Sequence, residues 1–93
     1  MSDVAVSCQP GGDGWTCHVT VSEGGSRSEH EVRVGRDELM RLAPGSTEPK
    51  ALVEASFAYL LEREPKEAVL RSFSIGEIER YFPGYGAEIR ARL

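Results

Sequence analysis

The chain has 93 residues, of which 40% are hydrophobic and 28% are charged. This length and composition predict one small globular domain, residues 1–93, and argue against intrinsic disorder. The net charge of −4 provides no overall attraction to nucleic acid or to an anionic membrane. No stretch approaches the roughly 18 apolar residues of a membrane helix, and the N-terminus lacks a signal-peptide pattern, so we expect a cytoplasmic protein. The basic residues are mostly arginine, which is typical of bacterial chains from GC-rich genomes.

Residues 1–35 alternate between apolar and polar side chains, with glycine-rich turns between the runs. Apolar residues occupy every second position from Val4 to Cys8 and from Trp15 to Val21, and a third run follows the second turn. Period-two alternation interrupted by such turns is the signal of β-hairpins. The sequence therefore predicts a three-stranded antiparallel β-meander with one apolar face.

The register of this meander follows from the positions of its turns. Gly12 supplies the positive φ of a two-residue turn at residues 12–13, and the second turn centres on residues 24–25. One face is then apolar and the other is polar, and a slip of one residue in either hairpin would scatter both sets. The expected pairs on the apolar face are Pro10–Trp15, Cys8–Cys17, Val6–Val19, Val4–Val21, Trp15–Val34, Cys17–Val32 and Val19–His30.

Residues 36–93 carry the helical signals. The predicted helices cover residues 37–43, residues 50–63, a segment after Pro65, residues 75–82 and a last segment after Pro83. Ser74 and Glu77 form a capping box at the start of the fourth of these helices. A lone three-stranded sheet is not stable in water, so something must cover its apolar face. The expected fold class is α+β: an N-terminal three-stranded antiparallel β-meander packed on one face by C-terminal α-helices.

Cys8 and Cys17 are directly opposed in the predicted register, and a disulfide between them is geometrically allowed. In a cytoplasmic protein, two buried reduced thiols are the interpretation that we favour. His30 points to the same face, at the rim of the sheet with its ring half exposed, and it could supply a third metal ligand. A fourth ligand and a C-x-x-C spacing are missing, so we expect neither a metal nor a cofactor.

The residue types that catalysis needs are sparse in this chain. No G-x-S-x-G elbow and no phosphate-binding glycine loop is present, and the two histidines, His18 and His30, both fall on predicted strands. His18 faces Glu31 on the polar side of the sheet, where such a pair is a weak surface contact. We therefore expect that the protein is not an enzyme.

Residues 65–82 provide the main argument for nucleic-acid binding. Two short helices joined by a tight turn have the outline of a helix-turn-helix. The second helix carries Glu77 and Glu79 against a single Arg80, whereas phosphate contacts require an excess of positive charge. A basic edge could still form from Arg71, Arg80, Arg90 and Arg92. A helix-turn-helix-like regulator is therefore the alternative function, and nucleic acid is a disfavoured partner.

Tyr81, Phe82 and Tyr85 belong to a dense aromatic group near the C-terminus, which is either a second layer of the core or a surface for a partner. The outer strands of the meander are open edges, and open edges invite strand addition or dimerisation. We therefore predict a non-enzymatic protein-interaction or regulatory module. Its expected partner is another protein or a second copy in a homodimer, bound through a sheet edge or through the aromatic group.

Overall fold

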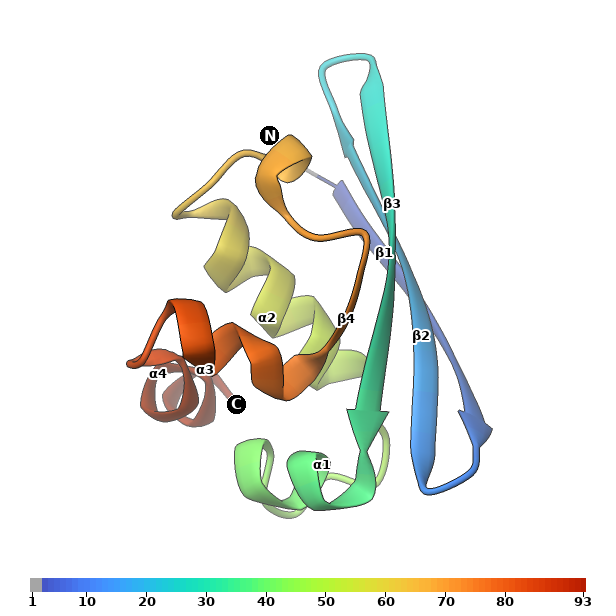
Figure 1. Cartoon of the computed structure of the whole chain (residues 1–93), viewed down its shortest axis with the longest axis vertical. Helices are drawn as coiled ribbons and strands as arrows, with labels where there is room; N and C mark the ends of the chain where they lie inside the picture. The colour runs from blue at the N-terminus through green and yellow to red at the C-terminus, as the bar shows by residue number, and fades with distance from the viewer. Residues whose placement is uncertain (1–2) are drawn as a thin grey trace.

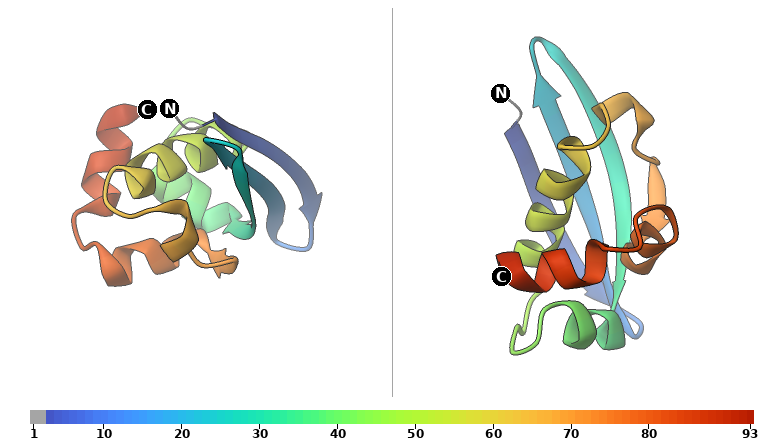
Figure 2. Two further views of the ribbon diagram at one scale, coloured as in Figure 1. Left: turned by 90° about the horizontal axis from the view of Figure 1, so that it is seen from above. Right: turned by 90° about the vertical axis from the view of Figure 1, so that its left-hand side faces the viewer.

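The computed structural model describes residues 3–93, and it consists of a twisted four-stranded sheet with all its helices on one face (Figures 1 and 2). The elements, in chain order, are β1 (Asp3–Gly11), β2 (Gly14–Glu23), β3 (Ser26–Gly35), α1 (Arg36–Leu42), α2 (Lys50–Leu61), the 3-10 helix η1 (Lys66–Ala68), β4 (Ser72–Ser74), the 3-10 helix η2 (Ile75–Glu77), α3 (Ile78–Tyr81) and α4 (Tyr85–Arg92). The α+β class expected from the sequence is confirmed.

The two hairpins have the predicted register at every position. Cys8 pairs with Cys17, and Cys17 pairs with Val32 on its other side, as the alternation required. The turns depend on glycine, since Gly12 has a φ of 59° and Gly24 and Gly25 have φ values of 55° and 85°. L-residues with a Cβ rarely adopt such values, so the glycines determine where each hairpin turns.

The prediction of a three-stranded sheet is wrong, because a fourth strand, β4, lies parallel to β3. Phe73 in the middle of β4 pairs with Val32, and the backbone N–H of Glu31 donates to the carbonyl of Arg71 at 2.7 Å. The sheet order is β1-β2-β3-β4, so β3 is an inner strand where β4 covers it. A strand of three residues is too short to show an alternation, which is why the sequence pattern does not reveal it.

The helices expected on either side of β4 are also shorter than predicted. The segment after Pro65 forms only the turn η1, because Val69 is already extended with a ψ of 132°. The helix expected over residues 75–82 is divided into η2 and α3. Its predicted capping box is present, and the Glu77 carboxylate accepts the N–H of Ser74 at 2.7 Å. The capping residues mark where the chain starts to turn, but they do not determine how far a regular helix continues.

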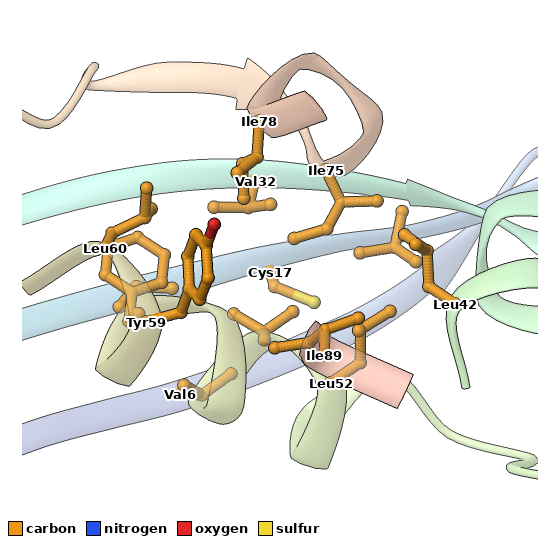
Figure 3. Packing of buried hydrophobic residues seen from close by; sticks show 14 of the residues in the cluster. Val6, Cys17, Val32, Leu42, Leu52, Tyr59, Leu60, Ile75, Ile78 and Ile89 are labelled. Carbon is orange, nitrogen blue, oxygen red and sulfur yellow. The ribbon is translucent and has the colours of Figure 1, made fainter. Parts of the chain in front are cut away.

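The core lies between the apolar face of the sheet and the helices (Figure 3). Cys17 lies near its centre, and Phe57 of α2 is fully buried above the sheet. The largest fully buried side chains are Tyr85, Phe57, Leu42, Leu52, Ile75, Ile89, Val19, Val21, Val32, Val34 and Val53. Burying one such side chain stabilises the fold by about 1.5–3 kcal/mol. The other face of the sheet carries Ser7, His18 and Glu29 and is open to solvent.

Glu38 of α1 ties the first helix to the segment that follows β4. Its carboxylate accepts the N–H of Gly35 at 2.8 Å and the N–H of Gly76 at 3.0 Å. The neighbouring Arg41 makes an ion pair with Glu79 at 2.8 Å. These contacts join elements that are almost forty residues apart, so they fix the position of η2 and α3 against the end of the sheet.

We predict that Gly14→Ala strongly destabilises the fold. A Cβ at Gly14 would overlap the carbonyl oxygen of Val34 and lie 2.8 Å from the Cα of Gly35, and a backbone clash can be relieved only by moving β2 away from β3. Urea unfolding should show a loss of about 2–3 kcal/mol. Gly11→Ala is the matched control, because a Cβ there meets no atom within 4 Å. Equal effects of the two substitutions would contradict this account.

Candidate interaction surfaces

Within residues 3–93, no strand lies beside the outer edge of β1. β1 is the terminal strand of the sheet, and within residues 3–93 no backbone hydrogen bond joins it to any segment except β2. Counting outward from the two-residue turn, Val4, Val6 and Cys8 occupy non-hydrogen-bonded pairs with β2. Their backbone N–H and C=O groups therefore point away from the sheet and are free to pair with another strand.

The side chains along this edge do little to prevent such pairing. Ala5 and Ser7 are exposed on the open face of the sheet, and both are small and uncharged. Charge and proline, which commonly protect a sheet edge, occur only near the two ends of the strand, as Asp3 and as Pro10. The centre of β1 is thus an unprotected edge, which we call the β1 edge (residues 4–8).

A cleft of about 370 Å³ opens on the side of the molecule next to β4. It is lined by Leu60, Glu64, Ala68, Val69, Leu70, Phe73, Glu77, Ile78, Tyr81 and Phe82, and we refer to it as the aromatic cleft. Leu70 and Tyr81 are 47% and 65% exposed, although both are large apolar side chains. The cleft thus combines an apolar floor with an exposed apolar rim, which is a common property of protein-binding sites.

The predicted partner surface, Tyr81, Phe82 and Tyr85, is divided by the structure. Tyr81 is exposed at the rim of the aromatic cleft, and Phe82 is half-buried with its ring edge-on to Tyr59 at a centroid distance of 6.0 Å. Tyr85 is fully buried, so its assignment to a partner surface is wrong. The spacing of Tyr85, Ile89 and Leu93 marks one face of α4, and that face turns inward at Tyr85 and Ile89.

Tyr85 makes a polar contact inside the core. Its hydroxyl lies 2.5 Å from the Oγ of Ser56, and Ser56 donates its own proton to the carbonyl of Leu52 at 2.7 Å. The Ser56 oxygen is therefore left to accept the proton of Tyr85. Burial raises the pKa of Tyr85 well above the ordinary value, because the phenolate would lose its hydration.

Cys8 and Cys17 form a disulfide with an S–S distance of 2.09 Å, so the expectation of two reduced thiols is wrong. The Cα atoms are 3.9 Å apart, which reflects a non-hydrogen-bonded cross-strand pair. Cys17 is fully buried, whereas Cys8 on the edge strand is half-buried. The register of β1 and β2 places the two cysteines directly opposite each other, which is the geometry that the bridge requires.

His30 is buried, and the expectation of a half-exposed ring is also wrong. Its Nδ1–H donates to the carbonyl of Leu70 at 2.7 Å, and its Nε2 lies 2.8 Å from the Oγ of Ser28. The ring also contacts Phe57 at a centroid distance of 5.3 Å. The Nδ1 contact thus holds β3 to the segment before β4, whereas the Nε2 contact lies within β3 itself. Within residues 3–93 no group of three or more His, Cys, Asp or Glu side chains could hold a metal ion.

The segment proposed as a helix-turn-helix has a different structure. Residues 65–82 contain η1, β4, η2 and the four-residue helix α3, so two helices joined by a turn are not present there. The proposed basic edge is partly neutralised, because Arg92 donates to Glu62 at 2.7 Å and lies 3.9 Å from Glu88. Arg71, Arg80 and Arg90 are exposed.

The sequence matches no protein-family model, no curated protein and no solved structure. Among the helices of residues 3–93, none is both long enough and apolar enough to cross a bilayer. The function is therefore inferred from the two surfaces themselves.

We predict that Tyr85 makes the fold sensitive to alkaline pH. Because the pKa of Tyr85 is raised in the folded state, the folded protein keeps a proton that the unfolded chain releases above pH 10 or so. The free energy of unfolding should therefore fall as pH rises above about 10, with a contribution approaching about 1.4 kcal/mol per pH unit. Tyr85→Phe should flatten this decline in denaturant titrations. Tyr81→Phe, which changes an exposed ring, should keep the wild-type slope, and an equal slope in all three proteins would refute the assignment.

We also predict that the Cys8–Cys17 bridge contributes modestly to stability. The bridge closes a short loop, with a sequence separation of nine, and short loops restrict the unfolded chain less than long ones do. Adding a thiol reductant should lower the free energy of unfolding by about 2 kcal/mol. A double variant, Cys8→Ser with Cys17→Ala, should not respond to the reductant. Two titratable thiols in freshly purified, denatured wild-type protein would show that the bridge is absent.

Proposed function

We propose that the protein is a non-enzymatic protein-interaction module that acts as a regulatory homodimer through the β1 edge. The supporting observation is the asymmetry of the sheet: β4 covers part of the outer edge of β3, while within residues 3–93 no strand pairs with the outer edge of β1. Unpaired strand edges are templates for pairing with another strand. The proposal requires no catalytic group, cofactor or metal, and it uses the sheet edge because Tyr85 of the aromatic group lies in the core.

The free backbone groups of the β1 edge are self-complementary. They belong to every second residue, so two antiparallel copies must match Val4, Val6 and Cys8 with one another. The register that uses all of them pairs Val6 with Val6 of the second copy, and Val4 with Cys8 of the second copy. Pro10, which has no N–H, lies beyond the last of these pairs.

The same register also suits the side chains. On the covered face it brings the half-buried Val4 beside the half-buried Cys8 of the second copy, so both lose contact with water. On the open face it places Ala5 opposite Ser7 of the second copy, where two small side chains approach without a clash. The two four-stranded sheets then form one continuous sheet with all helices on one side.

A charge-swap experiment tests both the dimer and its register. In Ala5→Lys with Ser7→Lys, two pairs of lysines would face each other directly across the interface, and we expect dimerisation to weaken about tenfold or more. In Ala5→Lys with Ser7→Glu, each lysine would face a glutamate, and the dimer should be retained. Both variants change exposed side chains of the same strand, so each is the control for the other.

The measurement is the molar mass from light scattering over a range of concentrations. The wild-type protein should approach twice its monomer mass of 10.2 kDa. A wild-type mass of 10.2 kDa at high concentration would refute the homodimer. A dimer that both variants disrupt equally would refute the proposed register. Salt-dependent retention of the wild-type protein on heparin would favour the nucleic-acid alternative over a protein partner.

A further inference from the structure

We propose that the aromatic cleft is a second, independent binding site, and that it takes apolar side chains from a basic amphipathic helix of another protein. The cleft lies beside β4, whereas the homodimer would use β1, and these strands are the two opposite edges of the sheet. Both sites can therefore be occupied at once. Each copy in the homodimer would carry one aromatic cleft, so the dimer would hold two copies of the partner close together.

The cleft is held open by the fold and does not require a partner to form. The carbonyl of Leu70 on its rim accepts the Nδ1–H of the buried His30 at 2.7 Å. The next residue, Arg71, accepts the N–H of Glu31 at 2.7 Å, and Phe73 is buried against the ring of Phe57 at 6.1 Å. Because β3 fixes this rim, a partner would lose little affinity to ordering of the site.

The rim of the cleft exposes large apolar side chains that the packing of the core does not cover. Leu70 and Tyr81 stand on its rim with 47% and 65% of their surface exposed, while Val69 and Ile78 between them are buried. The cleft volume of about 370 Å³ is near the lower end of the range for ligand sites. This size suits one or two anchoring side chains of a helix laid across the opening, as in helix-in-groove recognition.

The charge around the cleft determines the kind of helix. Among residues 3–93, the charged residues of its lining are Glu64 and Glu77 alone, and no arginine or lysine of that range contributes to it. Glu77 uses one carboxylate oxygen to accept the N–H of Ser74, and within residues 3–93 the side chain of Glu64 makes no hydrogen bond or ion pair. A lysine or arginine next to the apolar anchor would pair with these carboxylates, whereas an acidic residue would be repelled.

The test uses two labelled model peptides and fluorescence anisotropy at low ionic strength. One is an amphipathic helix of leucine and lysine, and the other has glutamate in place of every lysine. We expect the basic peptide to bind and the acidic peptide not to bind. Leu70→Ser should weaken binding of the basic peptide about tenfold, and Glu64→Gln should weaken it about threefold.

Matched controls separate the cleft from general surface effects. Met40→Ser removes another exposed apolar side chain, 70% exposed on α1, and Glu29→Gln removes a carboxylate from the open face of the sheet. Both controls should bind the basic peptide with wild-type affinity. Equal losses in the controls, equal binding of the two peptides, or no binding of the basic peptide would each overturn the proposal.

These experiments test the homodimer proposal and the cleft proposal separately. The variant Ala5→Lys with Ser7→Lys changes only the β1 edge, so as a monomer it should still bind the basic peptide as the wild type does. Loss of peptide binding in that variant would show that the site depends on the dimer and would overturn the independence of the two sites. Conversely, Leu70→Ser should leave the molar mass of the protein unchanged.

Discussion

The cross-strand pairing of β2 is the constraint on which the rest of the molecule depends. β2 is hydrogen-bonded on both sides, and Cys17, Val19 and Val21 present a continuous buried row to the helices. A shift of one residue would turn this row toward solvent and expose it on the open face. The close approach of Gly14 to the backbone of Val34 holds the same register at the end of the strand. The helices pack where they do because this row gives them an apolar surface to cover.

The pairing of β4 with β3 makes the two edges of the sheet different. His30, Glu31 and Val32 form hydrogen bonds or strand pairs with residues some forty positions later, and this contact covers that side of β3. No corresponding segment returns to β1 within residues 3–93. The aromatic cleft arises from the same event, because the residues that lead into β4 form its rim. This long-range contact thus forms the rim of the proposed partner site and covers part of one edge of the sheet. The edge that it does not cover is that of β1.

The local part of the fold could be predicted, and the long-range part could not. The hairpin register followed from alternation and from Gly12, Gly24 and Gly25, since these signals act between neighbouring residues. β4 escaped prediction because three residues carry no period and because its partner lies far away in the sequence. Tyr85 and Tyr81 look alike in a sequence of mixed aromatic and charged residues, and only packing separates the buried ring from the exposed one.

The parallel pairing of β3 with β4 also has a consequence for folding. Hairpins close within microseconds, whereas a contact between residues 30 and 70 must wait until the intervening loop has been ordered. A ribosome releases the chain from its N-terminus, so the meander emerges before β4 has been synthesised. During this interval both sides of the nascent sheet lack a neighbour, and polysomes bring nascent copies close together. The arrival of residues 72–74 closes one of the two sides, and it does so only after the whole meander has been made.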